Sequence, residues 1–188
     1  MRITERWLVG SQATASSNVY KFVGWYSDEA CTKPVTYDAT NNKFVPSKVN
    51  GLHVAATYYA KFEYNLTSLT INKEGWVGAD KNQTFIFKLV DDDGLELFVT
   101  IHGNGSVTID GLTVGKKYRL VEVTSWSWRY EYSGIDAEKT SVNVTTTEVE
   151  NGIEFTLNAT DNVITFKNTR NEDKWLDGDS WCDNIFKN

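Results

Sequence analysis

The chain has 188 residues, a length that corresponds to one or two domains. Its 40% hydrophobic and 13% aromatic content excludes a wholly disordered chain. A formal net charge of −6 without a basic cluster argues against a nucleic-acid partner and against contact with an anionic membrane. The sequence also lacks an apolar run long enough to predict a membrane span.

The first third of the chain predicts a small, aromatic-rich β unit. Residues 1–17 lack the apolar block of a signal peptide, so we expect a cytoplasmic protein or a fragment of a longer one. Two short strands are expected over residues 22–26 and 57–62, with a polar loop between them. Near residues 64–66 one strand pattern ends and another begins, so we expect a first domain over residues 1–65.

A β-hairpin is expected next. Apolar and polar residues alternate over 84–90 and 95–101, and Asp91-Asp92-Asp93-Gly94 lies between the two runs. Asp-Gly in this position is a strong hairpin signal, because glycine accepts the positive φ that such turns need. A calcium loop is the alternative, but the acidic spacing and the distal bidentate glutamate of such loops are missing. We therefore expect no metal site.

The rest of the chain also has the pattern of an all-β domain. Further strands are expected over residues 106–109, 117–124, 141–147, 153–158 and 162–167. Asp110-Gly111 and Val114-Gly115 separate some of them, and no helical stripe of useful length is present. This spacing predicts a β-sandwich of antiparallel sheets over residues 66–170. Residues 171–188 are polar and are expected to be a tail or a linker to a next module.

Cysteine and histidine give no sign of a metal or cofactor site. Cys31 and Cys182 are too few for a zinc site and have no histidine nearby, and a disulfide between them and two free thiols both fit the sequence. His53 and His102 are expected to be ordinary turn or surface residues. We expect no cofactor.

Three polar residues have the parity of inward-facing side chains, because alternate residues of a strand share a face. Lys73 shares parity with the apolar residues of 69–71, Glu122 with those of 118–120, and Asn168 with those of 164–166. Val121 and Val123 also give the other face of the Glu122 segment an apolar character. A buried lysine, glutamate or asparagine each costs several kcal/mol unless it is paired, so we expect the three to meet.

Together these side chains have the chemistry of a self-made crosslink. Burial favours the neutral amine of lysine and the protonated form of glutamate. The amine of Lys73 can then attack the carboxamide of Asn168, with Glu122 moving protons to the departing ammonia. The product is an intramolecular isopeptide bond, formed in one turnover, that closes a loop of roughly 95 residues and stabilises by about 4–5 kcal/mol. The alternative is that these strand-end residues reach solvent and form an ordinary surface salt bridge worth little.

At these residues the sequence resembles the collagen-adhesin B-type (Cna-B) domains of Gram-positive pilins and adhesins. The segments that carry the resemblance are 69–73, 109–122 and 163–170, the middle one with a GL-x-x-G-x-x-Y-x-x-x-E pattern. The resemblance implies a transthyretin/immunoglobulin-like β-sandwich with Lys73 as nucleophile, Asn168 as acceptor and Glu122 as proton shuttle. The sequence departs from the family where Ser125-Trp126-Ser127-Trp128 replaces the usual proline-rich segment.

The first domain resembles the internalin-type B repeat, a small β-grasp-like module of bacterial surface proteins. Residues 22–28 and 58–62 carry this resemblance, whereas residues 1–18 fit it poorly. Both resemblances imply an extracellular location on a Gram-positive cell. No Leu-Pro-x-Thr-Gly sorting motif is present, so we expect an excised piece that lacks signal peptide and anchor.

The leading interpretation is a structural stalk module without turnover, whose partners are the neighbouring modules of the same surface protein. The alternative is a module that binds a host glycan or matrix protein through exposed aromatic rings, with Trp126 and Trp128 as the candidates. Packing of these rings in the core is the ordinary explanation for them. An enzyme acting on an outside substrate is not expected, since no nucleophile elbow, phosphate loop or metal cluster appears.

Overall fold

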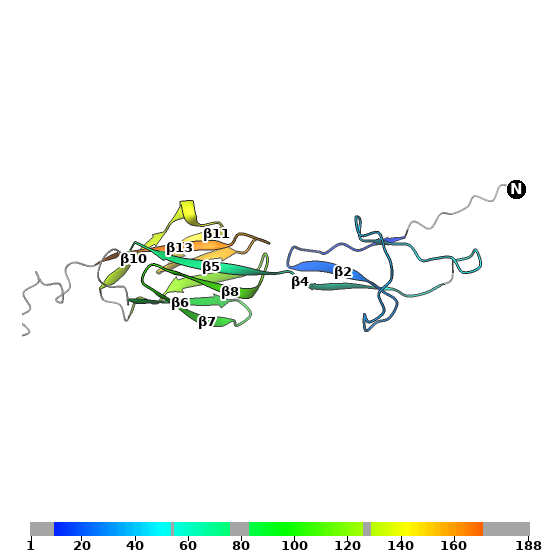
Figure 1. The fold of residues 1–188 in the computed structure, drawn as a ribbon, viewed down its shortest axis with the longest axis horizontal. Helices are drawn as coiled ribbons and strands as arrows, with labels where there is room; N and C mark the ends of the chain where they lie inside the picture. The colour runs from blue at the N-terminus through cyan, green and yellow to red at the C-terminus, as the bar shows by residue number, and fades with distance from the viewer. Residues whose placement is uncertain (1–9, 54, 76–82, 126–128, 171–188) are drawn as a thin grey trace, which may run out of the picture. The chain divides into compact units, whose positions relative to one another are not determined.

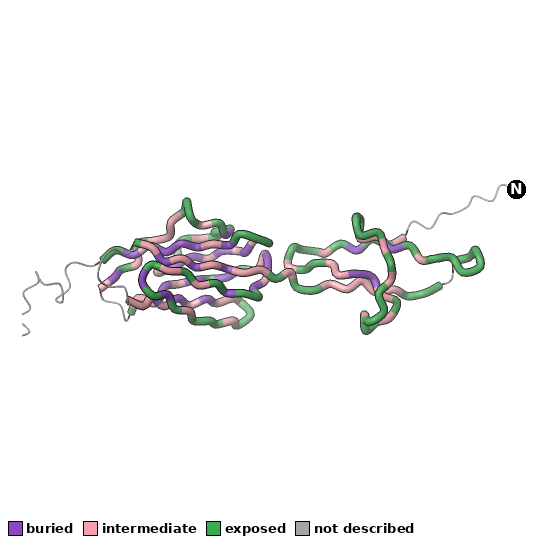
Figure 2. The backbone as a smooth tube through the Cα atoms, in the orientation of Figure 1, coloured by how far each residue is buried: buried purple, intermediate pink, exposed green. Residues whose placement is uncertain are grey.

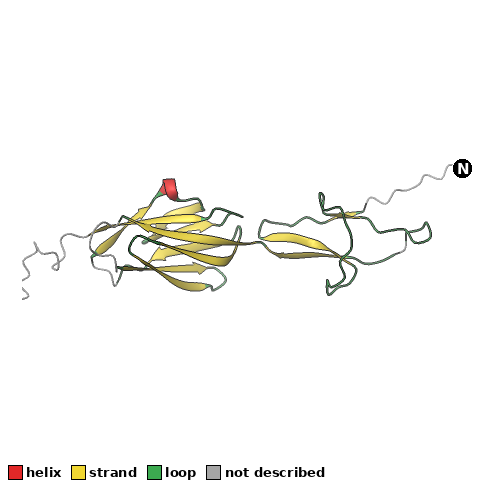
Figure 3. Cartoon of the chain, in the orientation of Figure 1, coloured by secondary structure: helices red, strands yellow, loops and turns green. Residues whose placement is uncertain are grey.

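The computed structural model describes residues 10–53, 55–75, 83–125 and 129–170. The chain divides into two compact units, the first ending at Asn65 and the second beginning at Leu66. Both consist of strands joined by turns, and one 3₁₀ turn, Ala137–Lys139, is the only helical element among the described residues (Figure 3). Within those residues no helix has the length and apolar character needed to cross a membrane.

The first unit holds two small antiparallel sheets. One pairs β1 (Ser11–Gln12) with β3 (Lys43–Phe44), and the other pairs β2 (Tyr20–Tyr26) with β4 (Tyr59–Tyr64). Trp25 and Phe44 are buried at its centre, and the indole N–H of Trp25 donates to the carbonyl of Asn42 at 2.9 Å. Aromatic packing therefore supplies most of the core of this unit.

The second unit is a sandwich of two sheets (Figure 1). The four-stranded sheet has the order β10 (Tyr130–Ile135), β13 (Val163–Arg170), β5 (Leu66–Glu74), β8 (Ser106–Thr113). The five-stranded sheet has the order β11 (Asn143–Val149), β12 (Gly152–Thr156), β9 (Lys117–Glu122), β6 (Thr84–Asp91), β7 (Glu96–His102). The all-β sandwich expected from the sequence is confirmed.

The core of the sandwich comes from alternate residues of the central strands. β5, β6 and β9 each show an alternating burial pattern, which places one side of every strand against the opposite sheet (Figure 2). The inward apolar side chains of both sheets form one continuous cluster. The same alternation carries Lys73 and Glu122 into that cluster at the ends of β5 and β9.

Three features of the sandwich differ from the expectation. β13 pairs with β5 in parallel, so the four-stranded sheet is mixed, while all pairs of the five-stranded sheet are antiparallel as expected. β8 continues through Asp110-Gly111 to Thr113, because Gly111 with φ +77° forms a bulge instead of a turn. β10 was not expected at all, and it pairs antiparallel with β13 at the sheet edge.

Gly152 has no room for a side chain. A Cβ added to this residue would lie 2.2 Å from the carbonyl oxygen of Leu120 and 2.8 Å from Cα of Val121, both backbone atoms of the neighbouring strand. We expect Gly152→Ala to lower the free energy of unfolding by about 2 kcal/mol, because β12 must move away from β9. Urea denaturation measures this loss. Thr156→Ala on the same strand is the control, and an equal effect of the two changes would contradict the prediction.

Candidate functional site

Three strands bring Lys73, Glu122 and Asn168 into the core of the sandwich. Lys73 is 1% exposed and lies near the end of β5, while Asn168 is 3% exposed and lies on the adjacent β13. Glu122, also 3% exposed, is the last residue of β9 in the opposite sheet. The site therefore lies between the two sheets at one end of the sandwich, and the inward placement expected from parity agrees with the burial of all three residues.

Strand pairing fixes where the lysine and the asparagine lie. In the parallel pair, Lys73 is level with Phe166 and Glu74 with Lys167, so Asn168 follows one step further along β13. Gly75 directly follows β5; its φ is +87°, and an added Cβ would lie 2.7 Å from the carbonyl oxygen of Asn168. Glycine is thus needed for the backbone of β5 to approach that of Asn168 so closely.

Aromatic rings surround the polar group. Lys73 Nζ lies 4.5 Å from the ring centre of Phe85. Phe87 is level with Glu122 in the five-stranded sheet, and its ring lies 4.9 Å from that of Phe166. Lys73 Nζ also donates to the carbonyl of Glu74 at 3.0 Å. The polar side chains therefore lie in a largely apolar environment that disfavours charge.

Glu122 and Asn168 are hydrogen-bonded to each other, and each keeps one atom without a partner. Asn168 Nδ2 donates to Glu122 Oε1 at 2.5 Å. Glu122 Oε2 and Asn168 Oδ1 are buried and have no hydrogen-bond partner in the structure. A proton on Glu122 Oε2 would supply the missing donor, because an acid and an amide can pair through two parallel hydrogen bonds. The pairing therefore suits a neutral glutamic acid.

Burial shifts both titratable groups toward their neutral forms. It lowers the pKa of Lys73 to about 8, although the attraction of Glu122 acts in the opposite direction. Burial raises the pKa of Glu122, while the Asn168 hydrogen bond and the charge of Lys73 oppose that rise. Burial and then the nearby Glu122 also raise the pKa of Tyr132. Burial thus makes the free amine of Lys73 and the acid form of Glu122 more accessible than in solvent, and amide formation requires both forms.

Sequence reasoning missed the residues that support this group. Phe85, Gly75 and Tyr132 lie around it, and Tyr132 is directly opposite Asn168 on β10. Phe85 was assigned only to a hairpin strand, and β10 was not expected. A glycine directly after a strand that ends in Lys-Glu was the available signal for Gly75.

The remaining predicted site residues are placed as follows. Trp126 and Trp128 lie outside the described residues, so the aromatic binding site stays a prediction. Cys31 is half-exposed, has φ +52° in a turn and forms no disulfide with another residue of the described part of the chain, while Cys182 lies outside it. A disulfide between the two cysteines likewise stays a prediction.

The acidic run between β6 and β7 forms a turn and an ion pair. Asp91 Oδ1 accepts the backbone N–H groups of Asp93 and Leu95, each at 2.9 Å. Lys116 Nζ lies 2.7 Å from a carboxylate oxygen of Asp91 and of Asp93. Both carboxylate oxygens of Asp91 and one of Asp93 thus have backbone or lysine donors, and no cluster of metal-ligating side chains occurs within the described ranges.

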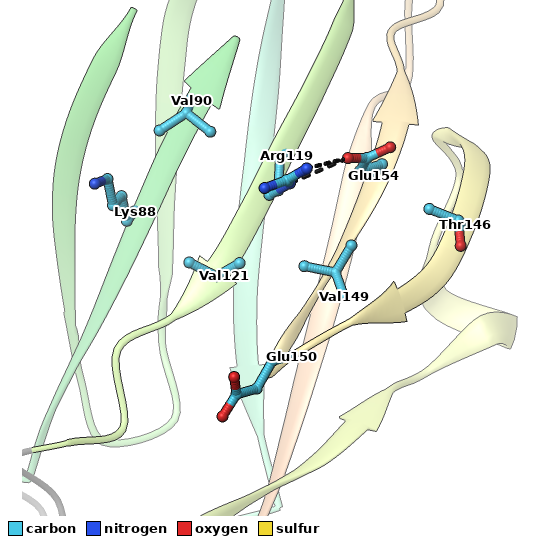
Figure 4. Close-up of a pocket in the computed structure, with 8 residues that line it drawn as sticks. All are labelled: Lys88, Val90, Arg119, Val121, Thr146, Val149, Glu150 and Glu154. Atoms are coloured by element: carbon cyan, nitrogen blue, oxygen red, sulfur yellow. Dashed lines mark hydrogen bonds and ion pairs between the residues drawn. The ribbon is translucent and has the colours of Figure 1, made fainter. Parts of the chain in front are cut away.

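A hollow of about 600 Å³ lies on the outer face of the five-stranded sheet (Figure 4). Figure 4 shows the valines of its floor and a glutamate of β12, Glu154, joined to Arg119 of β9. The lining residues are Lys88, Val90, Arg119, Val121, Thr146, Val149, Glu150 and Glu154. No aromatic ring lines the hollow, so it lacks the stacking surface that the glycan-binding interpretation requires.

No family model and no curated protein matches the chain. Two crystal forms of a bacterial adhesin from Mobiluncus mulieris, described as containing intramolecular disulfide, isopeptide and ester bond cross-links, match at 14% and 15% identity with a TM-score of 0.46. Each match covers 63% of this chain and 46% or 45% of the adhesin chain, so this chain spans less than half of that adhesin. At this identity and score the likeness carries no argument about function, and the named crosslinks are properties of that adhesin.

Proposed function

We propose that this chain is a structural stalk module of a bacterial cell-surface adhesin or pilin-like protein, stabilised by an isopeptide bond between Lys73 and Asn168. One observation carries the proposal: a lysine, a glutamate and an asparagine are buried together in the core, with the carboxyl hydrogen-bonded to the carboxamide. A charged lysine and a charged glutamate in such a place destabilise the fold, whereas a covalent amide removes the lysine charge. The resemblance to collagen-adhesin B-type domains supports the same chemistry.

The reaction balances without any outside reagent. Neutral Lys73 Nζ attacks Cγ of Asn168, and protonated Glu122 polarises the carbonyl by donating to Oδ1. The new Nζ–Cγ bond forms and the Cγ–Nδ2 bond breaks. Glu122 passes a proton from the attacking nitrogen to the leaving one, so that ammonia departs and the carboxyl returns to its starting state. The protein acts once on itself, and no external substrate is turned over.

The position of the bond suits a mechanical role. β5 is the first strand of the sandwich and β13 the last, and the two are adjacent and parallel. Force applied at Leu66 and Arg170 therefore pulls the two strands in opposite directions along their shared ladder. A bond near the ends of both strands carries that force directly. The strands between residues 74 and 167 are then shielded from the load.

A stalk role implies particular partners and a particular location. The partners are neighbouring modules of the same surface protein, and the location is the outside of a bacterial cell, where a stalk must resist shear. No cofactor is needed, because all reacting groups belong to the chain. Most binding of host ligands then belongs to other domains of such a protein.

Intact mass under denaturing, reducing conditions tests the bond. Expulsion of ammonia should leave the purified chain about 17 Da lighter than its sequence mass. Peptide mapping should join the peptides that contain Lys73 and Asn168. Glu122→Ala and Lys73→Ala should each have the full mass calculated from their own sequence, without the deficit. Lys139→Ala, which removes an exposed lysine that pairs with Glu74, is the control and should keep the deficit. A wild-type chain at full sequence mass would overturn the proposal.

A further inference from the structure

The edges of the two sheets are not protected equally. Edge strands expose backbone donors and acceptors that can pair with another chain, and bulges are one device that prevents it. Three of the edge strands, β8, β10 and β11, have register shifts against their neighbours. β7 is the fourth edge, and its seven residues pair with β6 without any shift. Figure 1 shows β7 at the border of the sheet beside β6.

The free side of β7 consists of its even-numbered residues. Asp91 donates to Leu95 and Gly103 donates to Gln83, which fixes the hydrogen-bonded pairs of the hairpin ladder. Because bonded and non-bonded pairs alternate in an antiparallel ladder, residues 97, 99 and 101 direct their backbone groups toward β6. Residues 96, 98, 100 and 102 direct theirs away from the sheet. β7 pairs with β6 alone among the described strands.

The sequence of β7 is complementary to itself when a second copy is placed antiparallel to it. With a two-fold axis at Val99, Glu96 lies opposite His102 of the second copy and Phe98 opposite Thr100. These are also the residues whose backbone groups are free, so the register satisfies both hydrogen bonding and side-chain pairing. Glu96 and His102 are exposed on the outer face, where Glu96 pairs with Lys88 at 2.8 Å and His102 Nδ1 lies 2.9 Å from Thr84 Oγ1. Beside these partners, a carboxylate and an imidazole from opposite copies meet at both ends of the pairing.

We propose that β7 is a homodimerisation edge, at which two copies of this chain pair their β7 strands antiparallel about Val99. The exposed side chains fit this use: Phe98 is 56% and Leu97 36% exposed, an apolar surface that a second strand would cover. The two five-stranded sheets then form one continuous sheet. The two-fold symmetry makes the interface isologous and closed, so association stops at the dimer. This inference is independent of the crosslink.

The interface is small, so the dimer is a weak one. A single strand pair buries less than about 1,200 Å², the range of transient complexes. We expect a dissociation constant of roughly 10–100 μM. Several copies held close together on a surface would have a local concentration above this value and would therefore dimerise. Sedimentation equilibrium of the full 188-residue chain up to about 1 mM should show a mass that rises from 21.3 kDa toward twice that value.

Two variants of Thr100 separate backbone pairing from side-chain effects. Thr100→Pro removes an N–H that points away from β6, which an edge strand tolerates, and should weaken dimerisation at least about 100-fold. Thr100→Ala is its matched control, because it shortens the side chain and keeps the N–H, and it should dimerise like wild type. Circular dichroism verifies that both variants keep the fold.

A charge exchange tests the register without altering the backbone. Glu96→Lys alone places two basic groups opposite each other, and His102→Glu alone places two acids opposite each other, so each should dimerise about 10-fold more weakly. An equimolar mixture of the two should recover association, because the introduced lysine and the introduced glutamate then lie opposite each other. A wild-type monomer at about 1 mM, a dimer that survives Thr100→Pro, or a mixture that stays monomeric would each overturn the proposal.

Discussion

Asn168→Ala is expected to lower the free energy of unfolding of the sandwich by about 4–5 kcal/mol through loss of the crosslink. The bond joins residues roughly 95 positions apart and so restricts almost the whole unfolded chain of this unit. With an unfolding entropy of about 2.1 cal/mol/K per residue, the melting temperature should fall by roughly 20 °C. Differential scanning calorimetry of the variant and the wild type measures the change.

A double-mutant cycle separates the crosslink from the other contacts of Asn168. Glu122→Gln keeps the size of the side chain but removes the proton shuttle, so this variant should also lack the bond and melt at a similarly reduced temperature. In that background Asn168→Ala should cost only about 1 kcal/mol more, the value of a lost hydrogen bond. Two outcomes would show that no bond contributes to stability. Either the losses of Asn168→Ala and Glu122→Gln simply add in the double variant, or both single variants and the double variant melt at the wild-type temperature.

Without the crosslink, the stability of the sandwich should rise with pH on the alkaline side. Burial lowers the pKa of Lys73 to about 8 from 10.5, so between these values the unfolded chain binds the proton and the folded chain does not. The free energy of unfolding therefore increases as the pH rises through this window. Above pH 10.5 the full increase due to Lys73, about 3 kcal/mol, has been reached. Urea denaturation of Asn168→Ala between about pH 7.5 and 10.5 measures the slope.

Lys73→Met in the same background is the control for this titration. It removes the amine and keeps a side chain of similar length in the core, so the excess slope should disappear while the titration of other groups stays the same. The raised pKa of Glu122 acts with the opposite sign, since its contribution is lost as the pH rises above the ordinary range of a glutamate. Equal slopes for the two variants would show that Lys73 is not held neutral in the core.

The alternation of apolar residues located the reacting group because it is a local property. Lys73, Glu122 and Asn168 follow two or more inward residues on their own strands, and the pleat of the strand alone sets the face on which each lies. Hydrophobic burial of the neighbours carries the polar side chain inward. The parity of these strands was therefore enough to place the three residues in the core.

The glycine at one sheet edge misled the sequence analysis. Gly111 was expected to separate two strands, yet it has a positive φ inside β8, where the strand bulges. A glycine in a turn and a glycine in a bulge have the same local sequence signal. Only pairing with a neighbouring strand distinguishes them, because that neighbour supplies the hydrogen bonds that continue the strand.

The sequence by itself determined the strand character, the hairpin at Asp91–Gly94 and the inward face of each reacting residue, since these depend on residues that are close in the chain. Only the tertiary structure decided that β5 and β13 lie side by side in parallel, that Glu122 approaches Asn168 from the opposite sheet, and that β7 is left as the regular edge. Those arrangements depend on contacts between residues far apart in sequence. The packing of the whole sandwich selects them, because it must bury both inner faces at once.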